Sequence, residues 1–253
     1  MTAYTMTKRL KTYREKKTID ETYTIKEFKE KILPFTVRDT AVQREAIWDA
    51  LMKAGYISTA IVGSGKFTPI HICSLPDLLE VAIKVRDFAF IKRLEKFIEA
   101  GYLYAHLDGG NRCDTFVDFY DNLVKCEAAD YSFLPVYMEN EDCEEVMVED
   151  AYVEAVETPM TYDELMENHP KIIEKMDNMT LIVFIYTDLS SEERADMFKM
   201  LNNGVNLNAA EFRNPSNSDV CIGIREYLNI KHKKLLIESG MITADKAKRF
   251  GAC

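Results

Sequence analysis

The stretch LIVFIYTDL, residues 181–189, constrains the possible folds more than any other part of this sequence. Its first six residues are apolar without a break, and most are of types that favour strands. A run of this kind is typical of a strand inside a sheet, where both faces are covered. We therefore predict a central strand here, with other elements burying it.

Two more strands and a hairpin are predicted elsewhere. KFTPIHICSL (66–75) and YLYAHL (102–107) are rich in strand-forming residues. Between them, residues 76–101 have the pattern of one long amphipathic helix or a helix pair. Residues 133–138 and 144–157 predict a hairpin around an acidic turn. Strands interleaved with helices indicate an α/β or α+β fold.

Helical patterns account for much of the remaining sequence. Residues 42–54 have apolar side chains at helical spacing, including Leu51, and Gly55 is the predicted stop. Residues 112–124 and the chain from about residue 213 onward are also predicted to be helical. The inward side chains of the 112–124 helix are Phe116, Phe119, Tyr120 and Leu123. Two capping boxes mark helix starts: Thr161 with Glu164, and Ser190 with Glu193.

Composition and charge narrow the function classes. A chain of 253 residues, 47% of them hydrophobic, can bury a substantial core. The net charge of −10 argues against a general polyanion binder. Residues 8–17 nevertheless carry six Lys/Arg against one Glu, whereas residues 139–157 carry nine acids and no base. The basic arm is either a nucleic-acid contact or a solvated terminus, and the acidic stretch is expected to be solvated.

Several site types are excluded or disfavoured. No apolar run reaches the ~18 residues of a membrane span, and the first residues lack the apolar core of a signal peptide, so we expect a soluble cytoplasmic protein. The six cysteines form no CxxC pair, which disfavours zinc and disulfide frameworks. His71 and Cys73 share one strand face and are best interpreted as core residues. GSGK (63–66) lacks the flanking residues and strand-to-helix order of a phosphate loop.

The segment DGGNR, residues 108–112, has the order that GSGK lacks, because it follows a strand and precedes a helix. Gly109 and Gly110 permit positive φ and close approach of a ligand. The N–H groups of the helix start favour an anion, and Arg112 could bind a phosphate in bidentate fashion. Asp108 could hold a metal ion or a sugar hydroxyl, and Asn111 could hydrogen-bond to the same ligand. The alternative is a plain turn in which the arginine pairs with a nearby aspartate.

Three stretches resemble, in order, the ParB/sulfiredoxin-like family that includes the GmrS/GmrD modification-dependent restriction proteins. Block one, VQREAIWDALMKAGYISTAI (42–61), is similar to the family's Q-R-x-x-x-W helix, and TPIHI after it to the P-P-I strand. Block two, LDGGNRCDTFVDFY (107–120), is similar to D-G-x-Q-R-x-T-T-L-x-x-F. Block three, ADMFKMLNNGVNLNAAEFRN (195–214), is similar to F-x-x-L/I-N-x-x-G-x-x-L-x-x-x-E-L-R.

The resemblance implies an α+β fold with a small mixed sheet and packed helices. It implies a basic N-terminal arm (1–34), a nucleotide-binding domain (35–214) and a helical C-terminal extension (215–253). Relatives bind or hydrolyse nucleoside triphosphates with a divalent metal, so the expected cofactors are a nucleoside triphosphate and Mg²⁺. Carried over by position, the nucleotide-binding residues are Gln43, Arg44, Gly109, Gly110, Asn111, Asn202 and Arg213. The expected catalytic residues are Asp108, Arg112 and Glu211, with Asp108 as the metal ligand.

The resemblance leaves two functions open. One is a metal-dependent nucleoside triphosphatase linked to nucleic-acid processing, restriction or antirestriction, acting in the cytoplasm (the host's, if a phage encodes it). The other is a non-catalytic module that docks on a protein or DNA through a degenerate pocket. Asn111 stands where the family has Gln, and Cys113 and Asp114 stand near its Thr pair. No HNH-like histidine arrangement is present, so a nuclease would come from a protein partner. Sulfiredoxin chemistry is excluded because Gly110 stands where the reactive cysteine belongs.

Overall fold

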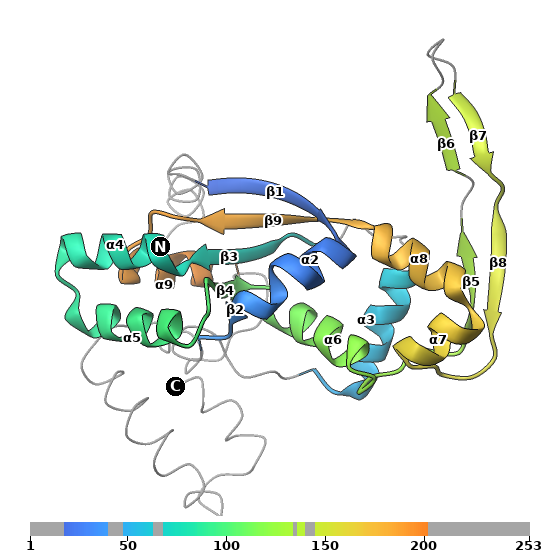
Figure 1. The fold of residues 1–253 in the computed structure, drawn as a ribbon, viewed down its shortest axis with the longest axis horizontal. Helices are drawn as coiled ribbons and strands as arrows, with labels where there is room; N and C mark the ends of the chain where they lie inside the picture. Colours follow the sequence, from blue (N-terminus) through green and yellow to red (C-terminus); the bar gives the residue numbers. More distant parts are fainter. Residues whose placement is uncertain (1–17, 40–47, 63–67, 134–135, 140–144, 202–253) are drawn as a thin grey trace, which may run out of the picture.

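The computed structural model describes residues 18–39, 48–62, 68–133, 136–139 and 145–201. Its centre is a five-stranded sheet in the order β1-β9-β3-β4-β2 (Figure 1). The bounds are β1 Thr18–Thr24, β2 Thr36–Val37, β3 Ile70–Ser74, β4 Tyr104–Asp108 and β9 Thr180–Tyr186. The pairs β1–β9 and β3–β4 are antiparallel, and β9–β3 and β4–β2 are parallel. The protein is therefore of mixed α+β class with a mixed sheet, as predicted at that level.

The strand predicted from LIVFIYTDL lies inside the sheet, between β1 and β3. Its side chains alternate between two cores, as the pleat of a strand requires. Leu181, Val183 and Ile185 of β9 belong to the first core, and Tyr186 to the second. The strands on both sides of β9 confirm the central-strand prediction, but its second face is covered only toward its end, since Ile182 is 44% exposed.

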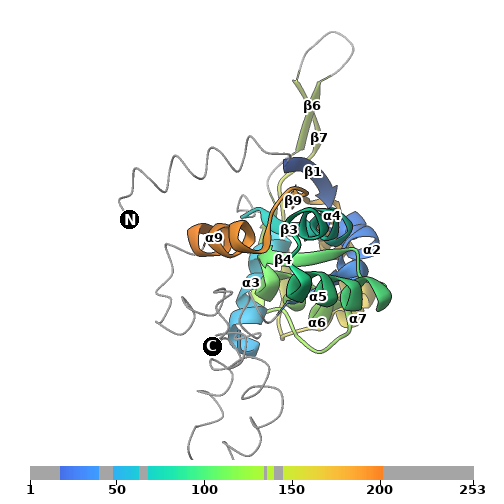
Figure 2. The same cartoon turned by 90° about the vertical axis from the view of Figure 1, so that its left-hand side faces the viewer.

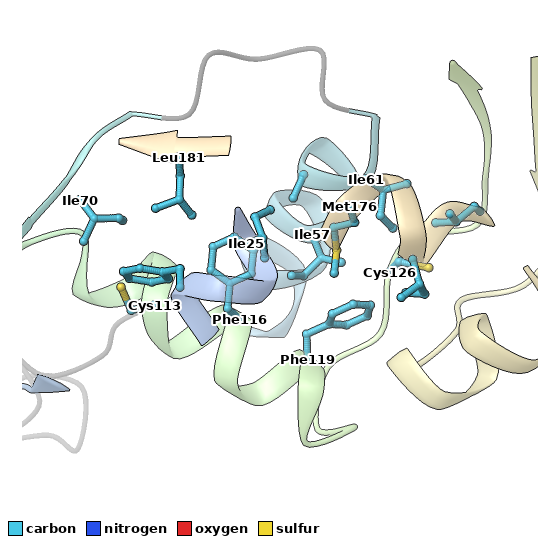
Figure 3. Packing of buried hydrophobic residues seen from close by; sticks show 14 of the residues in the cluster. Ile25, Ile57, Ile61, Ile70, Cys113, Phe116, Phe119, Cys126, Met176 and Leu181 are labelled. Carbon is cyan, nitrogen blue, oxygen red and sulfur yellow. The ribbon is translucent and has the colours of Figure 1, made fainter. Parts of the chain in front are cut away.

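Helices cover the two faces of the sheet. The first core packs against α2 Ile25–Lys31, α3 Ala50–Val62, α6 Gly110–Tyr120, α7 Tyr162–Asn168 and α8 Pro170–Asn178. In Figure 3, Phe116 and Phe119 of α6 lie among Ile57 of α3, Met176 of α8 and their neighbours. The second core packs against α4 Leu75–Val85, α5 Phe88–Glu99 and α9 Ser191–Leu201. A short 3₁₀ turn, η1 Leu33–Phe35, leads into β2.

Both predicted capping boxes are confirmed. Thr161 accepts a hydrogen bond from the Glu164 N–H, and Glu164 accepts one from the Thr161 N–H. Ser190 and Glu193 make the same reciprocal pair at the start of α9, at 2.9 and 3.2 Å. Because these bonds satisfy N–H groups that a helix start leaves unpaired, they fix where α7 and α9 begin.

The predicted hairpin is a long two-stranded ribbon, which we call the acidic ribbon. It consists of the antiparallel pairs β5 Ala129–Phe133 with β8 Tyr152–Val156 and β6 Val136–Glu139 with β7 Glu145–Glu149. Its base contributes Tyr131, Phe133 and Val156 to the first core. Its outer part stands clear of the sheet in both views (Figures 1 and 2).

Several local predictions are wrong. The helix of block one does not stop at Gly55 but continues to Val62, and Leu51 is 74% exposed. The buried residues of α3 lie in its C-terminal half instead, Ile57 to Ile61. Leu123 is also exposed, because α6 ends at Tyr120 and Asn122 has a positive φ of 60°, which breaks the helical phase.

Residues 18–34, the described part of the N-terminal arm predicted for residues 1–34, do not form an arm. Residues 18–31 form β1 and α2, and Ile25 and Phe28 are buried in the first core. These residues belong to the sheet and its helix layer, so the boundary at residue 34 does not hold. The basic residues 8–17, the GSGK segment and the C-terminal extension (215–253) lie outside the described residues. Among the described helices, none combines the length and apolarity that a membrane span needs.

Candidate functional site

The segment DGGNR joins the end of β4 to the start of α6, as its sequence predicts, and we call residues 108–112 the Gly-Gly turn. Gly109 adopts the left-handed conformation (φ 91°, ψ 6°) and precedes the first helical residue, Gly110. The first helical hydrogen bond runs from the Cys113 N–H to the Gly109 carbonyl at 3.0 Å. No side chain caps this helix start within the described part of the chain. The N–H groups at the start of α6 thus remain suited to an anion.

Only one of the two glycines needs its conformational freedom. Gly110 is not among the described residues with positive φ, so that part of the prediction is wrong for it. Two separate features require glycine at position 109. A Cβ there would lie 2.8 Å from Ile70 Cδ1 and 3.1 Å from Arg112 Nη2, in addition to the unfavourable φ. The first glycine therefore lets the strand end, Ile70 and the arginine fit together.

Arg112 is anchored on both sides. Its Nη2 donates to Asp108 Oδ2 at 3.0 Å, and its Nη1 donates to the Thr68 carbonyl. The Arg112 side chain is 12% exposed and that of Asp108 31% exposed. The Arg112–Asp108 pair is the contact that the plain-turn alternative requires. Because Arg112 lies in the first turn of α6, the pair also holds the guanidinium close to the helix start, where a bound anion would lie.

A second arginine reaches α6 from the end of β2. Arg38 Nη2 donates to Asp114 Oδ2 at 2.6 Å. His106 of β4 lies close enough to Arg38 and Arg112 for both to affect it, and its Nδ1 has no hydrogen-bond partner among the described residues. Burial, together with the positive charges of Arg38 and Arg112, lowers the pKa of His106 to about 3. His106 is therefore neutral at physiological pH.

The next residue, Asp39, turns to the opposite face of the sheet. Its Oδ2 accepts a hydrogen bond from Arg194 Nη1 of α9 at 2.6 Å and lies 3.6 Å from Arg93 Nη1. Asp39 and Arg194 are 2% and 1% exposed, so this ion pair is buried. The thiol of Cys73 lies beside Arg194, but burial raises its pKa to about 11. This cluster joins the β2 end to α5 and α9 and was not predicted from the sequence.

The described parts of the three blocks lie against one another. In α3 of block one, Lys53 forms an ion pair with Asp118 of block two. Tyr56 of the same helix packs edge-on against Phe116, with ring centroids 5.5 Å apart. Helix α9 of block three contacts β4 directly. Three segments that are far apart in sequence therefore meet at β4 and α6, the two elements that the Gly-Gly turn joins.

His71 was predicted to be a core residue, and its 8% exposure confirms this. It also lies next to the site. A register shift between His71 and Ile72 places Asp108 opposite His71 on the neighbouring strand. The His71 ring stacks on Phe184, with centroids 5.0 Å apart, and its Nδ1 is hydrogen-bonded to the Tyr186 hydroxyl at 2.9 Å. No sequence spacing indicates this neighbourhood, because it depends on a β-bulge.

Not all predicted site residues can be placed. Asp108, Gly109, Gly110, Asn111 and Arg112 come together at the Gly-Gly turn, where the Asn111 carbonyl accepts a hydrogen bond from Thr115 Oγ1. Five others lie outside the described residues: Gln43, Arg44, Asn202, Glu211 and Arg213.

The described residues offer a limited donor set for a metal ion. Within the ranges that the structure describes, no group of three or more His, Cys, Asp or Glu side chains could hold one. Asp108 alone is placed at the Gly-Gly turn, and it is paired with Arg112. A single carboxylate suits Mg²⁺ when phosphate oxygens and water supply the other ligands. The described residues therefore suit Mg²⁺ only together with a bound phosphate.

Comparison with known proteins gives no match: no protein-family model fits the sequence, and neither a curated protein nor a solved structure is similar to it.

Proposed function

We propose that this protein binds a nucleoside triphosphate with Mg²⁺ at the Gly-Gly turn and hydrolyses it in support of nucleic-acid processing. The observation that carries the proposal is the turn itself. A strand ends at Asp108, a left-handed Gly109 follows, and the uncapped start of α6 carries Arg112 in its first turn. Backbone N–H groups, a helix dipole and an arginine in this order are the common elements of phosphate sites.

Binding would exchange one partner of Arg112 for another. In the free protein the guanidinium is held by Asp108 and by the Thr68 carbonyl. A triphosphate at the helix start would compete with Asp108 for Nη2, because phosphate is also a strong charged acceptor. The released Asp108 carboxylate would then be available for Mg²⁺. The metal would neutralise phosphate charge and polarise the bond to be broken.

The convergence of the three blocks supports the same proposal. Arg38 forms an ion pair with Asp114 of α6, and Asp39 forms one with Arg194 of α9. The chain just before block one is therefore held against the helices that carry the other two blocks. This agrees with the resemblance to ParB/sulfiredoxin-like proteins, in which residues of all three blocks surround a nucleotide. We propose that fold family for residues 35–214 on the same grounds, with Gln43, Arg44, Asn111, Asn202 and Arg213 as further nucleotide contacts and Glu211 as a catalytic residue.

One observation favours the second candidate function, a non-catalytic module that docks on a protein or DNA. Arg112 already has two partners in the protein, and Asn111 and Cys113 replace residues that contact ligand in the family pattern. A module of this kind would act in the cytoplasm, the host's if phage-encoded, and would work with a partner that supplies a nuclease.

Calorimetric titration of the full chain with each nucleoside triphosphate and Mg²⁺ tests the proposal. We expect saturable binding of at least one triphosphate, weakened in Arg112→Ala. Phosphate release under the same conditions separates hydrolysis from binding alone. Lys31→Ala is the matched control, since Lys31 also forms an (i, i+4) ion pair, with Glu27 at 2.8 Å, on a different helix. Absence of binding by folded protein would favour the docking module. Gel-shift assays on plain and base-modified DNA, with and without residues 1–20, would then distinguish DNA from protein partners.

A further inference from the structure

The two ends of the molecule carry exposed surfaces of opposite character. One end is the turn between α4 and α5, and the other is the acidic ribbon, as Figure 1 shows along the longest axis. Neither surface takes part in the Gly-Gly turn, so each needs its own explanation.

The first surface, which we call the hairpin tip, consists of residues 83–88 (IKVRDF). Helix α4 ends at Val85, its C-cap Arg86 adopts the left-handed conformation, and α5 begins at Phe88. The tight reversal turns Ile83, Val85 and Phe88 outward, and Phe88 is 75% exposed. Lys84 and Arg86 are exposed between them. The acidic residue of the tip, Asp87, is occupied as the cap of α5 and as the acceptor for Ser191. The tip therefore presents apolar and basic groups together.

The second surface is the outer face of the acidic ribbon. One face of the β5–β8 pair is buried in the first core, so the opposite face points outward. On it, Val153 (60% exposed) lies opposite Ser132, and the next pair along is Asp130 with Ala155. Glu157, directly after β8, is exposed as well. This surface therefore presents apolar and acidic groups together.

The acidic ribbon has few packing contacts outside its base, so contact with a partner would stabilise it. In the described part of the chain, β6 and β7 pair only with each other, as do β5 and β8. Two-stranded ribbons are marginally stable by themselves in water and usually gain stability by packing. The base of the ribbon is packed, but Val153 and Met147 remain exposed to solvent.

We propose that the hairpin tip of one copy of this chain docks on the acidic ribbon of a second copy. The apolar groups would pack together, while Lys84 and Arg86 would face Asp130 and Glu157. Contact between two tips would bring like basic charges together, and contact between two ribbons would bring acids together, which disfavours a dimer that forms through two tips or through two ribbons. A tip-to-ribbon contact is heterologous, so it builds rings or open chains of copies.

Sedimentation velocity of the full chain, over a range of concentrations at low and high salt, is the first test. We expect concentration-dependent association at low salt and its loss at high salt, because exposed charges are screened. Phe88→Asp at the tip and Val153→Lys on the ribbon should each reduce the protein to single chains. Leu123→Asp is the matched control, since Leu123 is 73% exposed but lies at neither surface. Arg86→Glu and Asp130→Lys provide second variants of each surface, should a first variant fail to fold.

A mixing experiment separates this contact from a symmetric one. The Phe88→Asp chain retains its ribbon, and the Val153→Lys chain retains its tip. Mixed at equal concentration at low salt, they should form a one-to-one dimer that cannot grow further. If the wild-type chain stays single at all concentrations, or the mixture contains only single chains, the proposal is wrong. Association that persists in Phe88→Asp alone would overturn it equally.

Discussion

Arg112 Nη2 donates to Asp108 Oδ2 at 3.0 Å, one helical turn apart across the Gly-Gly turn. If a triphosphate binds the Arg112 guanidinium, the phosphate competes with Asp108 for it. Asp108→Asn should therefore strengthen binding of metal-free nucleotide, because the competing charge is gone. The same variant should lose the dependence of binding on Mg²⁺. Calorimetric titrations with Mg²⁺ and with a chelator measure both effects. Glu80→Gln, which alters an exposed (i, i+4) pair with Lys84, is the control that should behave as wild type. Unchanged Mg²⁺ dependence in Asp108→Asn would remove Asp108 from the proposed metal site.

Gly109 should be far more sensitive to substitution than another glycine with the same backbone conformation. Gly109 and Gly101 have φ of 91° and 90°, but an added Cβ meets Ile70 at 2.8 Å in the first and nothing within 4 Å in the second. Gly101→Ala should cost about 1–2 kcal/mol of unfolding free energy, from the left-handed backbone alone. Gly109→Ala should cost distinctly more, because the clash adds to that strain. Urea denaturation compares the two, and equal losses would show that the contact with Ile70 is easily relieved.

The buried pair of Asp39 and Arg194 should respond asymmetrically to loss of either partner. Asp39→Asn leaves Arg194, 1% exposed, without its counter-charge, and should cost about 3–5 kcal/mol of stability. Arg194→Met should cost less, because Asp39 keeps Arg93 at 3.6 Å. The double variant should recover part of the loss. Unfolding free energies from a double-mutant cycle test this, and equal effects of the two single changes would contradict it.

His106 should make the protein less stable as the pH falls. The unfolded chain gains a proton on this side chain below about pH 6.5, whereas the folded chain stays neutral down to about pH 3. Within that window the stability should fall by roughly 1.4 kcal/mol per pH unit from this group, and the loss is complete below the folded pKa. His106→Asn removes the group. Unfolding free energies at pH 7, 6 and 5 should therefore fall less steeply in the variant. Parallel pH profiles for variant and wild type would mean that folding leaves the pKa of His106 unchanged.

Local signals in the sequence predicted the inner elements of the fold. The strands at 70–74, 104–108 and 180–186 and both capping boxes depend on neighbouring residues, which a pattern can reveal. Strand β1 was missed because TIDETYT is polar and lies at a sheet edge, where only one neighbour is required. The exposure of Leu51 and Leu123 was missed because helix phase depends on where α3 begins and α6 ends.

The candidate site was predicted in part for the same reason. The Gly-Gly turn is contiguous in sequence, so its order of strand, glycines and arginine was readable. The Asp39–Arg194 pair joins residues 155 positions apart, and the position of His71 opposite Asp108 depends on a register shift. Contacts of these kinds leave no periodic signal. They follow from the packing of α9 and β4, which only the folded chain defines.

The central claim is that Arg112 holds phosphate, and the affinity of Arg112→Ala for nucleotide tests it most directly. Loss of a charge-assisted hydrogen bond to phosphate is worth about 1.5–3 kcal/mol, or roughly ten- to a hundredfold in dissociation constant. Arg112→Lys should recover part of this, since it keeps the charge but not the fork. We predict weakened triphosphate binding in Arg112→Ala at an unchanged melting temperature, with Lys31→Ala binding as wild type does. Wild-type affinity in folded Arg112→Ala would contradict the account and leave the arginine as a structural partner of Asp108 and of the Thr68 carbonyl.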